Sequence, residues 1–77
     1  MTILVIARTV DPHRQSEALR AALGLTLRGA RVEVVVTGPL LTPLAERSAA
    51  MLVSFGHVVD ADLTTALARA EVVEVWT

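Results

Sequence analysis

The side chains best suited to chemistry lie just after the first apolar stretch of the chain. Arg8, His13 and Arg14 flank Asp11-Pro12, a pair that is typical of the start of a helix. Free backbone N–H groups and the positive end of a helix dipole favour an anion at such a position, such as a phosphate, a sulfate or a carboxylate. The segment 9–12 contains no glycine, so it is not a glycine-rich phosphate loop. The alternative interpretation is a solvated capping loop.

The other titratable side chains give fewer indications of chemistry. Asp60 follows a later apolar stretch, and with His13 it could transfer protons in an enzyme. Asp60 and Asp62 could form a carboxylate pair, although we expect one of them to cap a helix. His57 follows Gly56 and opens a short apolar stretch, which favours a hydrogen-bonded structural histidine. Two histidines this far apart do not indicate a metal site, and we predict neither a cofactor nor a catalytic set of residues.

The scaffold for these side chains is predicted by residues 2–37. Thr2–Ala7 is a continuous apolar run, which suits a strand buried on both faces. A second and nearly unbroken run consists of Val32, Val34, Val35 and Val36. Between them lies a helical pattern that ends at Gly29, where a left-handed cap belongs. A helix between two such strands must be a right-handed crossover in a parallel sheet. Its expected apolar stripe is Ala18, Leu19, Ala22, Leu23, Thr26 and Leu27.

The rest of the chain continues this alternation of strand and helix. A second helix is expected from Thr42-Pro43 to Gly56, and a third after Asp60 or Asp62. Short strands are expected at His57–Val59 and Glu71–Trp76. The inward residues should be Leu44, Ser48, Met51, Leu52 and Phe55 in the second helix and Leu63, Ala66, Leu67 and Ala70 in the third. The order βαβαβαβ predicts an α/β fold: a single domain over 1–77, with a small parallel sheet of about four strands and helices on both faces.

The arrangement of the strands decides where a ligand or a partner could bind. We expect the common order 2-1-3-4, in which the first loop lies beside Asp60 at the point where the strand order reverses. One face of the sheet would then carry a single helix and leave the third and fourth strands uncovered. Trp76 is either an anchor in an interface or a cap on the core. The predicted oligomer interface is Leu25, Val53, Val73, Val75 and Trp76.

The composition excludes several classes of function and favours assembly. Hydrophobic residues make up 53% of the 77 residues, above the usual share of about 45–50%, so apolar surface should remain for other subunits to cover. The net charge of −1 gives no reason to expect nucleic-acid binding. No apolar stretch approaches the length of a membrane span, and Met1-Thr2 leads straight into a strand, so we expect no signal peptide and a cytoplasmic location. There is no cysteine, and hence no disulfide and no thiol chemistry.

Three stretches of the chain carry a resemblance to a known family. They are the opening ILVIA, the segment SEALRAALGLTLRGARVEVVVTG at 16–38, and ALARAEVVEVW at 66–76. In pattern the chain resembles the DsrE/DsrF/DsrH-like superfamily of small sulfur-relay proteins, although it is shorter than most members. The resemblance implies a parallel α/β sheet, assembly into trimers or hexamers, and persulfide transfer through a cysteine in the active subunits.

The chain departs from that family at the decisive residue, because without cysteine it cannot carry a persulfide. It therefore resembles the cysteine-less, supporting subunits, or a relative that has left sulfur transfer, and no family site residue can be placed on it. The first hypothesis is a non-catalytic subunit of a homo-oligomer or of an assembly with related subunits. The alternative is a module that binds a small anion or nucleotide-type ligand through Arg8, His13 and Arg14. An enzyme using His13 and Asp60 is a third hypothesis.

Overall fold

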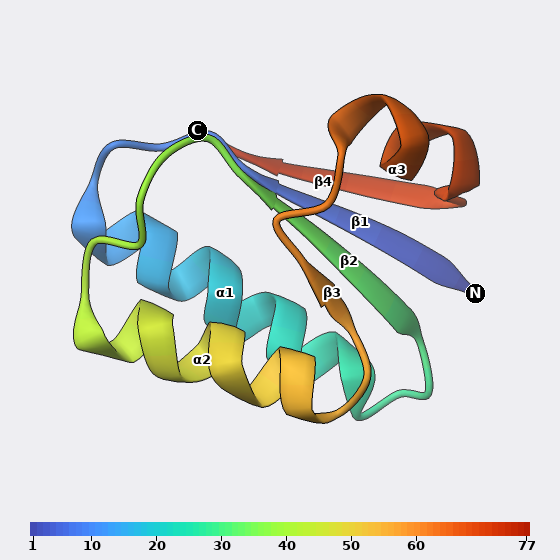
Figure 1. The fold of residues 1–77 in the computed structure, drawn as a ribbon, viewed down its shortest axis with the longest axis horizontal. Coiled ribbons are helices and arrows are strands. Elements are labelled where there is room, and N and C mark those ends of the chain that lie inside the picture. Colours follow the sequence, from blue (N-terminus) through green and yellow to red (C-terminus); the bar gives the residue numbers. More distant parts are fainter.

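A computed structural model describes residues 1–77 and has the predicted α/β fold, with four parallel strands and three helices (Figure 1). Each strand is followed by a helix until the last, so every connection is a crossover between parallel strands. The elements are β1 (Thr2–Ala7), α1 (Pro12–Thr26), β2 (Arg31–Val36), α2 (Pro43–Ser54), β3 (Val58–Val59), α3 (Leu63–Arg69) and β4 (Val72–Trp76).

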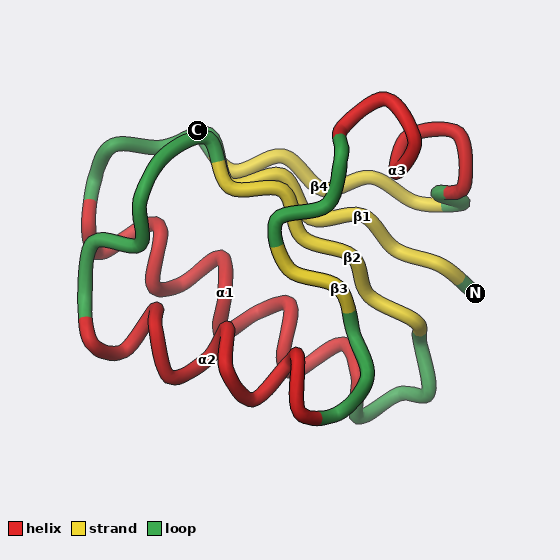
Figure 2. Tube along the Cα trace, in the orientation of Figure 1, coloured by secondary structure: helices red, strands yellow, loops and turns green.

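The strand order is β3-β2-β1-β4, so the expected order 2-1-3-4 is wrong. The chain moves outward from β1 through β2 to β3, and α3 then carries it back to the free side of β1. The length of β3 explains the difference, because a strand of two residues offers too few hydrogen bonds to lie inside a sheet. Right-handed crossovers in this order place α1 and α2 on one face and α3 alone on the other (Figure 2). The expectation that one face of the sheet carries one helix and the other face two is confirmed, and the single helix is α3.

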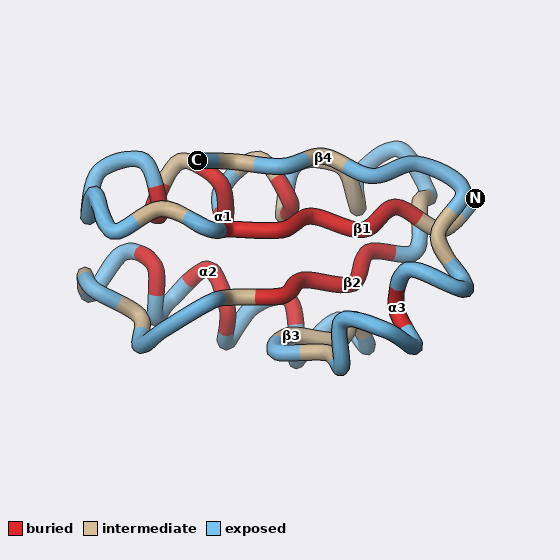
Figure 3. Tube along the Cα trace, turned by 90° about the horizontal axis from the view of Figure 1, so that it is seen from above, coloured by how far each residue is buried: buried red, intermediate tan, exposed pale blue.

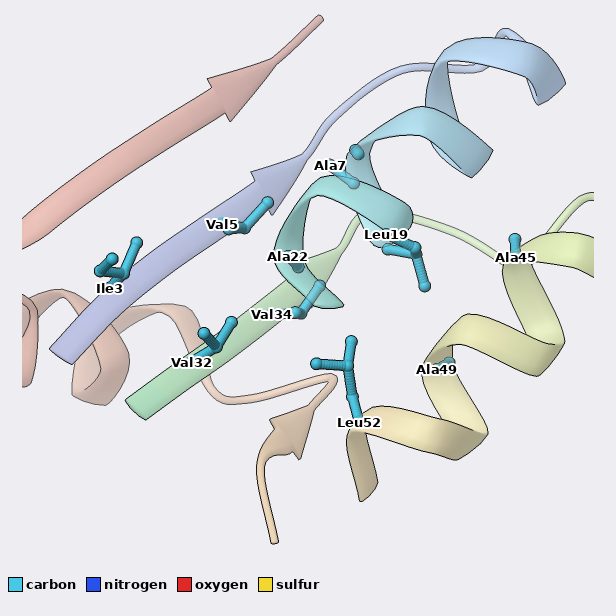
Figure 4. Close-up of a cluster of buried hydrophobic side chains, with 11 residues drawn as sticks. Ile3, Val5, Ala7, Leu19, Ala22, Val32, Val34, Ala45, Ala49 and Leu52 are labelled. Carbon is cyan, nitrogen blue, oxygen red and sulfur yellow. The ribbon is translucent and has the colours of Figure 1, made fainter. Parts of the chain in front are cut away.

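The main core lies between the sheet and the helices α1 and α2 (Figure 4). Alternate residues of β1 and β2 point into it, as the two-residue period of a strand requires. Its buried members are Ile3, Val5, Ala7, Ala18, Leu19, Ala22, Val32, Val34, Ala45, Ala49 and Leu52.

The two long helices use somewhat different faces from those expected. In α1 the buried stripe starts earlier, at Gln15 and Ser16, while Leu27 is exposed. In α2 the small residues Ala45 and Ala49 are buried with Ser48 and Leu52, and the larger Leu44, Met51 and Phe55 are exposed. The inward assignment of Leu44, Met51 and Phe55 is therefore wrong. The alanines let α2 approach closely, whereas larger side chains at those positions would hold it away.

The second face of the sheet has a much smaller core. Its buried members are Leu4, Ile6, Val35 and Ala66, and only the last comes from α3. The expected inward residues Leu63 and Leu67 are half exposed, because a helix of seven residues touches the sheet along little more than one turn. Seen from above, the inner strands are buried, β4 is largely exposed and β3 is partly buried (Figure 3).

The predicted starts of the helices are confirmed, as is the end of α2 at Gly56, whereas α1 ends at Thr26 with Leu27 as its cap and Gly29 lies in the turn that follows. The side chains of Asp11, Thr42 and Asp62 each accept hydrogen bonds from backbone N–H groups in the first turn of their helix. Gly29 and Gly56 have positive φ angles of 81° and 86°, in the left-handed region that glycine adopts without strain.

Candidate functional site

Arg8 and Arg14 lie at the carboxyl edge of the sheet, where β1 and β4 end. The backbone N–H of Arg8 donates to the carbonyl oxygen of Trp76 at 2.8 Å, so this residue continues the pairing of the two strands. Nε of Arg14 donates to the carbonyl oxygen of Thr77 at 2.8 Å, and its guanidinium carbon lies 5.3 Å from the centroid of the Trp76 ring. This distance is typical of a cation–π contact. The guanidinium of Arg14 is therefore partly engaged by the end of β4.

The first turn of α1 already holds a negative charge. Oδ1 of Asp11 accepts hydrogen bonds from the N–H groups of His13 at 2.9 Å and Arg14 at 3.2 Å. A bound anion would use the same N–H groups, so it would have to displace the carboxylate or bind beside it. The side chains of Arg8 and His13 are exposed, and neither makes a hydrogen bond or an ion pair. They are the two groups of the predicted anion site that are free to contact a ligand.

Asp60 lies apart from this group of basic residues. It follows β3, and β2 separates β3 from β1, so the expected placement beside the first loop is wrong. Its φ angle of 66° is in the left-handed region, and the N–H of Ala61 next to it donates to the carbonyl oxygen of Val34 at 3.0 Å. The residue after Asp60 therefore still bonds to β2 before the chain leaves for α3. The pairing of His13 with Asp60 that proton transfer would need is not assembled.

A polar cluster that sequence reasoning missed joins the first turn of α1 to the loop before α2. Gln15 is buried; its Nε2 donates to the carbonyl oxygen of Pro39 at 3.0 Å, and its Oε1 accepts from the N–H of Leu41 at 2.8 Å. The hydroxyls of Ser16 and Thr42 lie 2.6 Å apart. The sequence does contain a signal for the burial of Gln15. It lies three residues before Ala18 and four before Leu19, so it shares the buried face of the helix with them. These residues hold the loops in place and leave no buried polar atom unsatisfied.

The only ion pair in the structure fastens α3 to the sheet. Glu33 of β2 is fully buried on the α3 face, and its carboxylate accepts two hydrogen bonds from the guanidinium of Arg69, one of them from Nε at 3.0 Å. The bond from Arg69 lowers the pKa of Glu33 below its ordinary value, although burial acts in the opposite direction. Asp62 at the other end of α3 also has a lowered pKa, because its carboxylate accepts hydrogen bonds from the side chain and the N–H of Thr65. Both ends of α3 thus depend on an ionised carboxylate.

His57 has the structural role that its position predicted. Its Nδ1 accepts a hydrogen bond from the N–H of Val32 at 3.1 Å, so a neutral ring carries its proton on Nε2. The bond ties the start of β2 to the loop before β3. Nowhere do three histidine, aspartate or glutamate side chains gather closely enough to hold a metal ion.

One groove lies along the seam between α1 and α2, away from the sheet. It has a volume of about 410 Å³ and is lined by Arg20, Leu23, Gly24, Leu27, Met51 and Phe55. Four of them, Leu23, Leu27, Met51 and Phe55, are apolar residues that were expected to face the core. The groove contains no group suited to acid–base or nucleophilic chemistry.

The five predicted interface residues occupy different parts of the surface. Val73 and Val75 lie on the α3 face, where their exposed fractions are 43% and 52%. Val53 is exposed on α2, whereas Leu25 is half-buried against the main core. Trp76 pairs with Ala7, so it lies on the opposite face from Val75 and packs against the main core. Exposed β-branched residues are therefore concentrated on β4.

None of the three helices is both long and apolar enough to cross a membrane. Comparison of this chain with models of known protein families, with curated proteins and with solved structures finds no match.

Proposed function

We propose that this chain is a non-catalytic subunit of an oligomeric assembly, to which it contributes the face of its sheet that carries α3. The supporting observation is the unequal cover of the two faces. On the α3 face, Leu63, Leu67, Val73 and Val75 have exposed fractions between 42% and 52%. Apolar surface of this kind is stabilised when another subunit removes it from water. The resemblance to sulfur-relay proteins and the absence of cysteine support the role of a supporting subunit in persulfide transfer, in the cytoplasm.

Sedimentation of the purified chain at micromolar concentration tests the assembly. We expect a mass of more than one chain, as homo-oligomers bury apolar faces in this way. Leu67→Arg places a charge on the α3 face and should shift the equilibrium toward the single chain. Val10→Arg is the matched control, because Val10 lies in the loop before α1 and is 92% exposed. A single chain at every concentration, alone and with candidate sister subunits, would contradict the proposal.

Binding of a small anion or nucleotide-type ligand is a second candidate. It is supported by the free side chains of Arg8 and His13, which lie at the same edge of the sheet as Arg14. A ligand that binds only the folded state raises the melting temperature, so inorganic phosphate and nucleotides should raise it in the natural chain and not in Arg8→Ala. Arg47→Ala is the control, since Arg47 is exposed on α2. An unchanged melting temperature with every anion ends this candidate.

A further inference from the structure

The outer edge of β4 is an open strand edge of the sheet. β4 pairs with β1 on one side and with no strand on the other, and it runs for five residues. The opposite edge of the sheet is β3, which has only two residues before Asp60 turns the chain away. A long, regular edge presents unpaired N–H and C=O groups to any strand that can align with it. The two edges therefore differ in their capacity to pair.

The outward groups of β4 can be assigned from its pairing with β1. The N–H of Arg8 donates to the carbonyl oxygen of Trp76, which fixes Trp76, and by alternation Glu74 and Val72, as the residues bonded to β1. The N–H and C=O groups of Val73 and Val75 consequently point away from the sheet. Both are β-branched residues, which favour strands. The free edge therefore offers two donors and two acceptors in strand geometry.

We propose that β4 pairs antiparallel with β4 of a second copy of this chain, so that two sheets join into one. This inference rests on the proposed function as an assembly subunit and names its partner and the mode of contact. A two-fold axis perpendicular to the sheet relates the copies, and the α3 faces of both lie on the same side. The exposed Val75 of each copy thereby meets Val75 of the partner subunit, and Val73 lies diagonally across from it.

The charge of Glu74 decides which residues of the two β4 strands lie opposite each other. If Glu74 lay opposite Glu74 of the partner subunit, two like charges would meet on one face, which is destabilising. With Val75 opposite Val75 of the partner subunit, the outward groups of the two residues bond to each other. Glu74 then lies opposite Trp76 of the partner subunit, at a Cα separation of about 4.5 Å. The guanidinium of Arg14 covers that ring, so each Glu74 meets a positive charge of the other copy. Glu74 makes no ion pair within its own chain.

The pairing of the two β4 edges stops at two copies. Each copy uses its β4 edge once, and the edge that remains at either end of the joined sheet is β3. Two residues followed by a left-handed turn at Asp60 provide a poor template for further strands. The expected product is therefore a dimer and not a fibre.

Val75→Pro tests the pairing, because proline removes the outward N–H and leaves the bonds between β4 and β1 in place. Proline is tolerated on an edge strand where the N–H faces solvent. Two symmetric hydrogen bonds are lost, so the dissociation constant of the dimer should rise roughly tenfold or more. Val75→Ala is the matched control: it shortens the same side chain but keeps the N–H, and we expect a much smaller rise. A melting curve of each variant establishes that it is folded.

A charge exchange tests the register independently of proline. Glu74→Arg alone should weaken the dimer, because it sets a second guanidinium against Arg14 of the partner subunit. The combination of Glu74→Arg with Arg14→Glu should restore the dimer. Dimerisation that is insensitive to both changes would overturn the register, and dimerisation that survives Val75→Pro would overturn the pairing.

The outcomes separate this inference from the proposed function. If Leu67→Arg weakens the assembly and Val75→Pro does not, the α3 face forms the interface and the edge pairing is wrong. If only Val75→Pro weakens it, the edge pairs and the assembly does not depend on the α3 face. A natural chain that sediments alone as a single molecule at every concentration contradicts the edge pairing, and one that also stays single with candidate sister subunits contradicts both.

Discussion

The two faces of the sheet are held in different ways. On one face, α1 and α2 contribute Ala18, Leu19, Ala22, Ala45, Ala49 and Leu52 to a core of 11 buried apolar residues. On the other face, α3 contributes Ala66 alone to a core of four. What holds α3 in addition is polar: the ion pair of Arg69 with Glu33 and the cap that Asp62 provides. One face is therefore stabilised mainly by removal of apolar surface from water, and the other largely by charge.

This difference has a consequence for function. Apolar burial against α1 and α2 does not depend on an ionised group and is not weakened by charge screening, so these helices form the stable part of the molecule. A short helix with one buried residue opens locally at a lower free energy than the whole chain unfolds. The α3 face thus combines exposed apolar side chains with the helix that can most readily adjust to a partner.

The largest loss of stability is expected for Leu19→Ala in the main core. Leu19 is fully buried, and truncation removes apolar contacts and leaves a cavity, so the free energy of unfolding should fall by about 2–5 kcal/mol. Leu67→Ala on α3 is the matched control, since Leu67 is half exposed; it should lower the free energy of unfolding by about 1 kcal/mol at most. Denaturant unfolding measures both. Equal losses would contradict the described difference between the faces.

Arg69→Ala is expected to cause the next largest change, confined at first to α3. The substitution leaves the carboxylate of Glu33 buried without a partner, which is strongly unfavourable. Hydrogen exchange should show that the amides of α3 lose protection, while those of α1 and α2 keep theirs.

The double variant Arg69→Ala with Glu33→Leu distinguishes the loss of the ion pair from the burial of an unpaired carboxylate. Replacing both partners by apolar groups removes the unpaired carboxylate, so much of the lost melting temperature should return. A double variant as unstable as Arg69→Ala would mean that the stem of the arginine, and not its charge, holds α3.

Acid should loosen the α3 face before the main core. The pKa values of Glu33 and Asp62 are lowered in the folded chain, so the unfolded chain binds more protons in acid. Their contribution to stability is fully present above the unfolded-state pKa of about 4 and is lost as the pH falls through the lowered values. Between about pH 5 and pH 2, protection of the α3 amides should fall first. Glu33→Gln should show a shallower dependence of melting temperature on pH than the natural chain.

The sequence was sufficient for the order of elements and for most helix ends. The apolar run at 2–7 and the nearly unbroken one at 32–36 predicted strands of a parallel sheet. Asp11, Thr42 and Asp62 cap the helices because of their side-chain oxygens. Gly29 and Gly56 marked helix ends through the backbone angles that glycine permits. These are local properties, which a single sequence carries directly.

The strand order and the placement of Asp60 depended on long-range choices. Periodicity does not tell which edge of β1 the fourth strand will join, so Asp60 was expected beside the first loop and lies two strands away. The pairing of Glu33 with Arg69 was missed for a similar reason. Glu33 reads as a solvent-facing residue within an apolar strand, and its partner lies 36 residues further along the chain.

The smallest effect is expected at Asp60, where the chain leaves β3 for α3. Its φ angle of 66° is unfavourable for most side chains, but aspartate tolerates it and glycine adopts it freely. Asp60→Gly should therefore change the free energy of unfolding by less than about 1 kcal/mol, since a more flexible unfolded chain offsets the relief of strain. Asp60→Val should lower it by about 1–2 kcal/mol, because a β-branched residue clashes with its own backbone there. Thermal unfolding of the two variants gives the difference in their stability.

Since Asp60 directs the chain from the α1 and α2 face toward the α3 face, the valine variant should reduce amide protection in β3 and α3 and leave that of α1 unchanged. Equal stability of the glycine and valine variants would mean that the turn relaxes to a negative φ, and that the crossing to α3 does not require this geometry.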